Sequence, residues 1–311
     1  MKNIKKLPVF FILILLLGIN KTISATEVFI AFKVNNNIIT NLDIEKESKY
    51  LQALNKELKT LDKKEIYELA KNSIIKEKVK KDEILKFYQL DGTNKFLDEL
   101  VRNFYLRLNI SNLEDFTTHL NNFDLKLDEI VKKIEIETVW NELIFKKYNN
   151  QVKININEIK KKINKEIKGE KIQEQILLSE ILFLADNDKD FQKKYLMIKD
   201  DINKSGFKNA ANIHSISETS KFGGEVGWIK KGQLSDLLKK QILSLSIGET
   251  TIPIKLPNGF LILRLDDKKN VEVEINLEKE LQNSISYERN KQLNQFSLIY
   301  FNKIKVNTVI K

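Results

Sequence analysis

Cysteine is absent from this sequence of 311 residues, and histidine is scarce. A chain without cysteine forms no disulfide bond and has no thiol chemistry. Its two histidines, His119 and His214, lie far apart in sequence and have no companion cysteine, so we predict no metal site. The sequence also lacks a phosphate-binding loop and a nucleophile with a matched base. We therefore predict that the protein uses no cofactor.

Arginine accounts for only four of the 53 basic residues, although the formal net charge is +10. Specific recognition of nucleic acids depends strongly on the planar, bidentate guanidinium of arginine. Lysines interspersed with glutamates along helices are typical of solvated faces instead. We predict no nucleic-acid partner, and a structural or polyanion-binding envelope protein remains an alternative that rests on the lysine excess alone.

The N-terminus has the pattern of a secretory signal peptide. Lysines at positions 2, 5 and 6 precede an unbroken apolar run of nine residues from Val9 to Leu17, and small residues follow up to Ala25. The run is shorter than the roughly 20 residues that span a bilayer. We predict that residues 1–25 are a signal peptide, cleaved after Ala25, with an uncleaved anchor as the alternative. The mature chain would then be a periplasmic protein without stable membrane insertion, and its formal charge would fall to +6 because residues 1–25 hold four lysines and no acidic residue.

The few glycines are unevenly distributed. The sequence has only ten, yet Gly223, Gly224, Gly227 and Gly232 fall within ten positions. Glycine loses more conformational entropy on folding than any other residue, unless the backbone needs a left-handed or closely approached geometry. The cluster therefore predicts a folded turn structure that other residues would not adopt.

The motifs around this cluster follow one another in a recognisable order. They are Gly223 to Trp228, Gly232-Gln233-Leu234, Gly248-Glu249, Pro253 and Gly259-Phe260-Leu261-Ile262. This series, over roughly residues 173–267, resembles the parvulin (PpiC-type) family of peptidyl-prolyl isomerases. The resemblance implies a small domain with an antiparallel sheet flanked by helices. The Gly-Gly-Glu-Val-Gly-Trp block occurs once in the sequence.

The same resemblance predicts the site residues. Glu180 and Leu261 stand where the family has histidines, and Ser217 falls near a position that is Cys or Asp in many members. The apolar positions of the family's site match more closely than its polar positions. Leu234 and Leu238 match the apolar pair of the helix after Gly-Gln, and Phe260 matches the closing aromatic. We predict Glu180 and Ser217 as catalytic candidates. Leu234, Leu238, Phe260 and Leu261 are the peptide-binding candidates, and all are expected to converge on one shallow groove.

Prolyl isomerisation is compatible with this residue set, because it needs no nucleophile and no metal. Its uncatalysed barrier of about 18–20 kcal/mol arises from the partial double bond of the peptide. An apolar pocket lowers the barrier by binding the twisted form more tightly than the planar one. Loss of the histidines is therefore expected to weaken catalysis without removing the binding of proline peptides.

Helical patterns dominate the rest of the chain. A strand-like opening at residues 28–40 leads into helices with capping signals at Thr40 and Asp62. This opening resembles the N-terminal domain of SurA-type periplasmic chaperones. An amphipathic helix from Leu277 to about Phe301 and an alternating, strand-like end from Ile304 to Ile310 have no core of their own, and in SurA-type proteins such a helix packs back on the N-terminal domain. We predict an α+β protein with a helical domain at 26–168, a parvulin-like domain at 169–269 and a returning tail at 270–311.

Three classes of function follow from these observations. The leading one is a periplasmic folding factor that binds unfolded or extended polypeptide clients, with outer-membrane β-barrel precursors expected by resemblance and a degenerate isomerase site. The second is an active peptidyl-prolyl cis-trans isomerase, which the apolar pocket favours and the missing histidines oppose. The third is the non-catalytic envelope protein named above.

Overall fold

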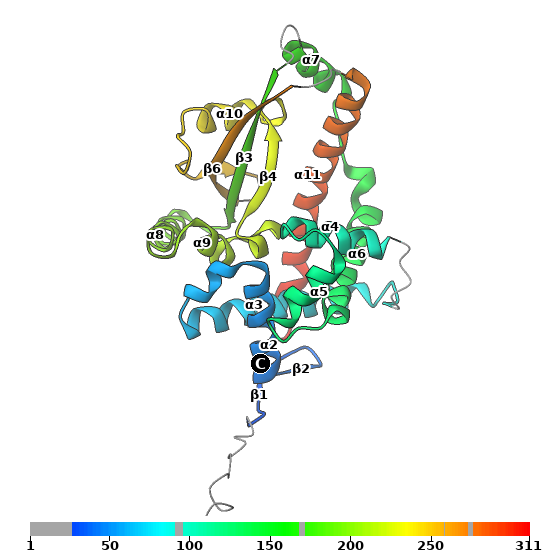
Figure 1. Cartoon of the computed structure of the whole chain (residues 1–311), viewed down its shortest axis with the longest axis vertical. Coiled ribbons are helices and arrows are strands. Elements are labelled where there is room, and N and C mark those ends of the chain that lie inside the picture. The colour runs from blue at the N-terminus through cyan, green and yellow to red at the C-terminus, as the bar shows by residue number, and fades with distance from the viewer. Residues whose placement is uncertain (1–26, 91–95, 168–171, 258, 273–275) are drawn as a thin grey trace, which may run out of the picture.

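The computed structural model describes residues 27–90, 96–167, 172–257, 259–272 and 276–311 (Figure 1). The predicted signal peptide at residues 1–25 lies outside these ranges. None of the helices in the described ranges is long and apolar enough to cross a bilayer.

The chain opens with a hairpin and continues as a set of helices. Strands β1 (Ile30–Val34) and β2 (Asn37–Thr40) pair antiparallel. The helices that follow are α2 (Asn41–Leu54), α3 (Lys63–Ile84), α4 (Leu97–Arg107), α5 (Leu113–Asn121), α6 (Leu127–Tyr148) and α7 (Ile156–Ile167). Two predicted helix starts are confirmed, because Thr40 and Asp62 both form capping boxes with the acidic residue three positions later.

A four-stranded antiparallel sheet comes next. Its strands are β3 (Ile172–Phe183), β4 (Glu225–Lys230), β5 (Ile254–Leu256) and β6 (Gly259–Glu272), in the spatial order β4-β3-β6-β5. The helices of this part are α8 (Asp188–Ser205), α9 (Phe207–His214) and α10 (Asp236–Ile242). We call β3 to β6 with α8 to α10 the sheet unit. The predicted α+β class is confirmed.

Each face of the sheet has its own hydrophobic cluster. One cluster joins Ile181 and Ile262 of the sheet to Phe207 and Ala210 of α9. The other contains Ile242 of α10 and several sheet residues, and we call its side of the sheet the α10 face. The two clusters alternate along β3 because successive side chains of a strand point to opposite faces.

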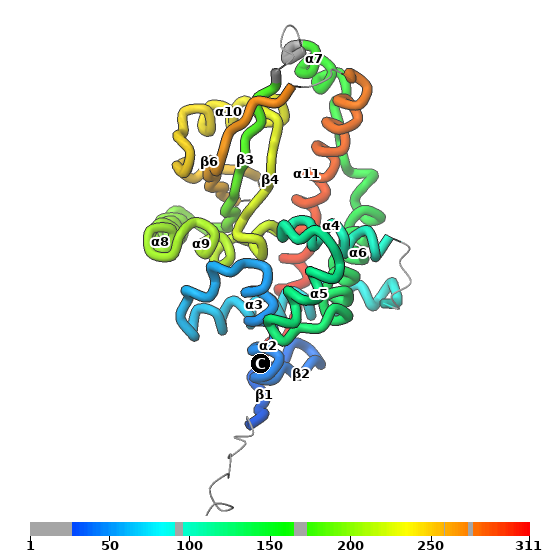
Figure 2. The backbone as a smooth tube through the Cα atoms, in the orientation of Figure 1, coloured from blue at the N-terminus to red at the C-terminus, as the bar shows by residue number. Residues whose placement is uncertain are grey.

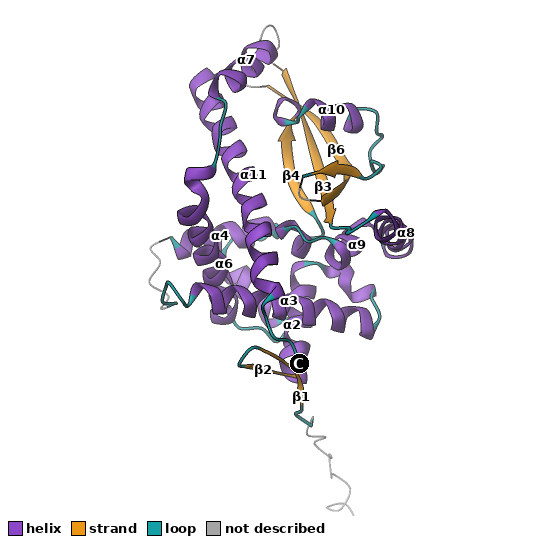
Figure 3. Cartoon of the chain, turned by 180° about the vertical axis from the view of Figure 1, so that it is seen from behind, coloured by secondary structure: helices purple, strands orange, loops and turns teal. Residues whose placement is uncertain are grey.

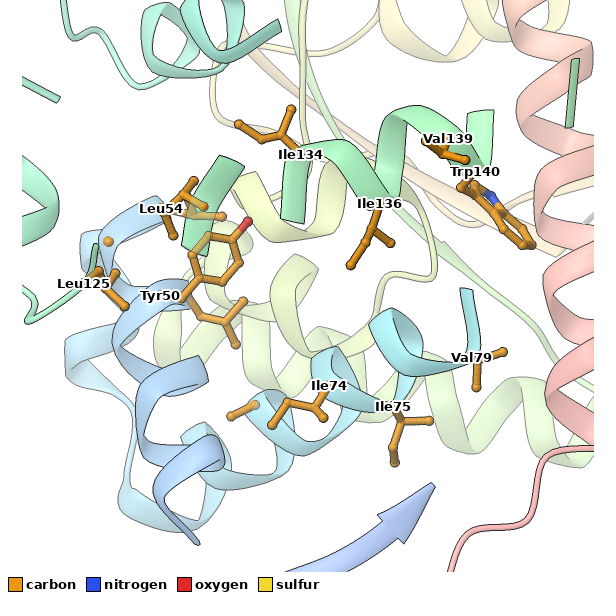
Figure 4. Packing of buried hydrophobic residues seen from close by; sticks show 14 of the residues in the cluster. Tyr50, Leu54, Ile74, Ile75, Val79, Leu125, Ile134, Ile136, Val139 and Trp140 are labelled. Carbon is orange, nitrogen blue, oxygen red and sulfur yellow. The ribbon is translucent and has the colours of Figure 1, made fainter. Parts of the chain in front are cut away.

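The last helix, α11 (Leu277–Val306), returns along the sheet unit to the N-terminal helices (Figure 2). Tyr300 and Phe301 are buried in the same cluster as the side chains of α2 to α6, and we call α2 to α6 with α11 the helical body. Figure 4 shows the packing of this cluster, in which Trp140 has no exposed surface. The indole Nε1 of Trp140 donates a hydrogen bond of 2.8 Å to Ser297 Oγ of α11.

The predicted strand at residues 304–310 is wrong. Helix α11 continues through Val306, and of the segment that follows only Ile310 bridges to a strand, pairing with Val34 of β1. Tyr300, Phe301 and Ile304 all contact the core. Their spacing of one, three and four residues is helical, and it prevails over the apparent alternation of apolar residues. The backbone nitrogen of Lys33 donates to Lys311 O at 2.8 Å, so the chain end lies against the N-terminal hairpin.

Candidate functional site

Glu180 lies on the α10 face of the sheet. Its strand neighbours on that face, Leu178 and Leu182, both belong to the cluster that contains Leu234 and Leu261. Glu180 is half-buried. The structure therefore places this carboxylate beside an apolar surface.

Two hydroxyl groups hold the carboxylate of Glu180. Ser217 Oγ donates to Glu180 Oε1 at 2.5 Å, and Thr219 Oγ1 donates to the same oxygen at 2.9 Å. The predicted pair Glu180 and Ser217 is thus in direct contact, although their roles remain predictions. Sequence reasoning missed Thr219. Its signal was the spacing of two residues from Ser217, because Ser217 caps the 3-10 helix Glu218–Phe222 and Thr219 lies in its first turn.

The apolar wall beside this carboxylate comes from α10, the residues just before it, and β6. Leu234 and Leu261 are buried, and Leu238 in the first turn of α10 is half-buried against the same cluster. The side chain of Ser235 caps α10 by accepting a hydrogen bond from the backbone nitrogen of Leu238. This cap fixes the direction of the helix and with it the position of the wall.

Phe260 does not belong to this wall, and the expectation that it shares the groove is wrong. Its ring stacks on Phe183 at 5.6 Å between centroids and lies 4.4 Å from Phe191 of α8, on the opposite face of the sheet. Adjacent residues of a strand point to opposite faces, so Phe260 and Leu261 cannot both line one groove. Phe260 is a packing residue between the sheet and α8.

The residue between the two hydroxyls points to the helical body. Glu218 begins the short 3-10 helix η3 (Glu218–Phe222), and its Oε1 lies 2.9 Å from Nζ of both Lys76 and Lys80 in α3. Lys80 is 1% exposed and also pairs with Glu137 Oε2 of α6 at 2.7 Å. The segment 217–219 therefore joins the candidate site to a buried ion-pair group.

Within this group, Lys80 and Glu218 stabilise each other's charges. Burial alone would lower the pKa of Lys80, but the carboxylates of Glu137 and Glu218 outweigh it and raise that pKa. Burial raises the pKa of Glu218, and the charges of Lys76 and Lys80 more than reverse this, so the pKa lies well below its usual value. Both ions are therefore charged at neutral pH.

A second contact holds the other end of η3. Arg107 Nη2 of α4 donates to the backbone oxygen of Glu225 at 2.6 Å, and its guanidinium lies 4.0 Å from the centroid of the Phe222 ring. Phe222 in turn meets Phe104 edge-on at 5.7 Å. The short helix is thus fixed to α3 at its start and to α4 at its end.

Helix α11 flanks the sheet unit beside β4, as Figures 1 and 3 both show. Lys230 of β4 forms an ion pair with Glu280, and Leu298 packs against the hydrophobic cluster of the α10 face. Burial raises the pKa of Tyr287, and the charges of Glu180 and Glu288 raise it further. Tyr287 is therefore within electrostatic reach of the candidate site.

Within the described ranges, no group of three or more His, Cys, Asp or Glu side chains is arranged to hold a metal ion. His214 bonds Asp201 at 2.5 Å, and the ring of His119 is 2.9 Å from the backbone oxygen of Ala53. Both histidines thus have local partners in the fold.

Known proteins resemble this chain in two ways. The rotamase family described as the PPIC-type PPIASE domain matches residues 176–267. Chaperone SurA of Pseudomonas putida is 29% identical over 164 residues, which are 50% of this chain and 38% of that protein. Chaperone SurA of Pseudomonas aeruginosa is 26% identical over 167 residues, 50% of this chain and 39% of that protein. The chain thus matches about two fifths of the length of these relatives.

Among solved structures, the chain is similar to a crystal structure of a PpiC-type peptidyl-prolyl cis-trans isomerase domain, with 26% sequence identity. The match covers 33% of this chain and 97% of the solved chain, and its TM-score is 0.30. The PrsA protein of Bacillus subtilis is 17% identical and covers 88% of this chain and 91% of its own, with a TM-score of 0.29. The match of residues 176–267 and the SurA relatives point the same way. The chain is thus similar to SurA chaperones over about half of its length, and residues 176–267 match the PpiC-type rotamase domain.

Proposed function

We propose that this protein is a periplasmic folding factor that binds extended segments of unfolded exported proteins. Its parvulin domain then acts as a peptide-binding module whose isomerase site is slow or silent. The proposal extends to the arrangement of the chain: residues 26–168 and 270–311 form one chaperone-like domain, and residues 169–269 are inserted into it as a satellite.

One observation carries the proposal for the site. Glu180 stands where the family has a histidine, and two hydroxyls donate their hydrogen bonds to it. An ionised carboxylate is an acceptor only, and a hydroxyl whose proton is already donated has none to offer to a substrate. The site therefore lacks the donor that favours a pyramidal prolyl nitrogen in the transition state. The apolar wall of Leu234, Leu238 and Leu261 still suits a proline ring.

The clients are inferred from the SurA likeness and from the physical chemistry of the site. Strands of outer-membrane β-barrels alternate apolar and polar residues, so their unfolded chains expose regularly spaced apolar side chains. A surface with a leucine wall and a hydrogen-bond acceptor binds such segments without reading a defined sequence. We propose outer-membrane β-barrel precursors as the main clients.

Suppression of aggregation tests the chaperone proposal. An unfolded outer-membrane β-barrel protein is diluted from urea into buffer, and light scattering is followed with and without an equimolar amount of this protein. We expect lower scattering, whereas an inert folded protein at the same concentration has no effect. Unchanged scattering together with retention on a polyanion column would instead favour the envelope-protein alternative.

The isomerase alternative predicts a different result for a histidine swap. Glu180 and Leu261 occupy the same face of the sheet, so the double variant E180H/L261H restores both family histidines on that face. We expect the isomerisation rate of an Ala-Pro peptide to rise at least about tenfold, which corresponds to about 1.4 kcal/mol of barrier. The matched control E180H/F260H puts the second histidine on the opposite face and is expected to raise the rate less than E180H/L261H does. A wild-type rate as high as that of ordinary parvulins, unaffected by the swap, would show that the site is active as it stands.

A further inference from the structure

We propose that the Lys80–Glu218 ion pair is a positioning device, through which the helical body holds Ser217 and Thr219 on Glu180. The candidate site of the parvulin domain is then complete only while that domain is docked on α3 and α4. The inference takes the peptide-binding role of the site from the proposed function. The contacts that link Lys80 to Glu180 do not depend on that function.

Three consecutive residues make the link. Ser217 and Thr219 donate to Glu180 inside the parvulin domain, while Glu218 between them bonds Lys76 and Lys80 outside it. Ser217 is the N-cap of η3, and its side chain accepts a hydrogen bond from the backbone nitrogen of Thr219, so residues 217–219 form one turn. A shift of Glu218 therefore moves both hydroxyls together.

Lys80 makes the docked position specific. With 1% of its side chain exposed, it has two carboxylate partners, one from α6 of the helical body and one from the parvulin domain. A buried ammonium needs partners at defined positions, because a missing one leaves part of its charge uncompensated. In the docked position, Lys80 contacts Glu218 at 2.9 Å and Glu137 at 2.7 Å at the same time.

Backbone hydrogen bonds also connect Thr219 to Glu180, by way of Gly224. Gly224 N donates to Thr219 O at 3.0 Å, and Glu180 N donates to Gly224 O at 2.8 Å. The contact of Arg107 with Phe222 and Glu225 holds this stretch from the side of α4. Loss of docking is therefore expected to loosen the strand-to-strand bond at Glu180 as well as the two hydroxyl contacts.

Two variants of the same ion-pair group separate positioning from stability. E218Q and E137Q each remove one carboxylate charge next to Lys80, but only Glu218 is part of the segment that contacts Glu180. Hydrogen exchange of the Gly224 and Glu180 amides is measured in the full-length protein, with the Thr251 amide, which donates to Leu263 O at 2.8 Å, as an internal reference. We expect exchange at Gly224 and Glu180 to be at least about tenfold faster in E218Q than in E137Q, relative to Thr251. Equal exchange in the two variants would overturn the inference.

A second variant covers the case in which E218Q does not fold. Arg107 is an exposed residue of α4 that contacts the end of η3 and donates to the backbone oxygen of Glu225. The variant R107A is therefore expected to raise the hydrogen-exchange rate of the Gly224 amide while the Thr251 amide stays protected. No change at Gly224 in a folded R107A protein would equally contradict the coupling.

Peptide binding then distinguishes this inference from the proposed function. Titration of a fluorescent Ala-Pro peptide is expected to give weaker binding for E218Q and for S217A, and the double variant is expected to bind no more weakly than the poorer single variant, because both changes act on one contact. Simple additivity of the two losses would overturn the coupling. If exchange changes as expected but the wild-type protein binds no peptide, the coupling stands and the proposed peptide-binding role fails.

Discussion

Alanine in place of Trp140 is expected to lower the free energy of unfolding by about 3–5 kcal/mol, the usual range for a fully buried tryptophan. Its indole stacks on Tyr300 at 5.8 Å and meets Phe301 edge-on at 6.4 Å. The variant also removes the hydrogen bond to Ser297 and the ring over which Lys80 Nζ lies at 5.4 Å. Because all these partners but Lys80 belong to α11, the loss falls on the attachment of that helix.

Urea unfolding followed by circular dichroism measures this effect, and the chain offers a matched control. The other tryptophan, Trp228, lies on the edge strand β4 and is 40% exposed, so its replacement by alanine is expected to cost no more than about 1 kcal/mol. Limited proteolysis is expected to cut α11 sooner in the Trp140 variant. Similar losses of stability for both tryptophan variants would contradict the conclusion that Trp140 attaches α11 to the helical body.

Alanine at Gly224 is the second substitution with a large expected effect. The φ angle of Gly224 is +81°, and a Cβ atom there would lie 2.4 Å from the backbone oxygen of Glu180 and 2.9 Å from Ala211 Cβ. The left-handed backbone alone costs about 1–3 kcal/mol for a residue with a side chain, and the collision with backbone adds to it. We expect the variant to lose about 3 kcal/mol or more of stability.

Gly227 provides the control three residues later in the same cluster. Its φ of +101° is also unfavourable for alanine, but a Cβ atom added there would have no neighbour within 4 Å, so the substitution carries the backbone strain alone. Its expected cost is about 1–2 kcal/mol by chemical denaturation. If Gly227→Ala proved as damaging as Gly224→Ala, steric contact with Glu180 would not be the reason that Gly224 is needed.

Local rules predicted much of the fold. The capping boxes at Thr40 and Asp62 depend on residues three positions apart, and the need for glycine at Gly224 follows from the scarcity of glycine elsewhere. The end of α11 could not be predicted in this way. The alternation of apolar residues after Ile304 resembles a strand until the core contacts of Tyr300 and Phe301 are known.

The candidate site was predicted in part. The pair Glu180 and Ser217 follows from the motif order, and the placement of Phe260 on the far face follows from strand alternation, a rule that was available from the sequence. The contact of Glu218 with Lys80 was not available, because it joins residues 138 positions apart in different parts of the fold. Acidic and basic residues are abundant in this chain, so composition alone does not indicate which two meet.

The pairing of the chain end with β1 has a consequence for the order of synthesis. Residues 172–272 are contiguous, so the sheet unit has all its strands as soon as that stretch has emerged, before the C-terminal helix is complete. The core around Trp140 instead is complete only after Tyr300 and Phe301 have been synthesised. The N-terminal hairpin obtains its last pairing partner only with Ile310. Contacts of such long separation form late and slowly. A nascent chain therefore passes through a stage in which the middle is folded while the first half still exposes the apolar surface that the last 35 residues will cover.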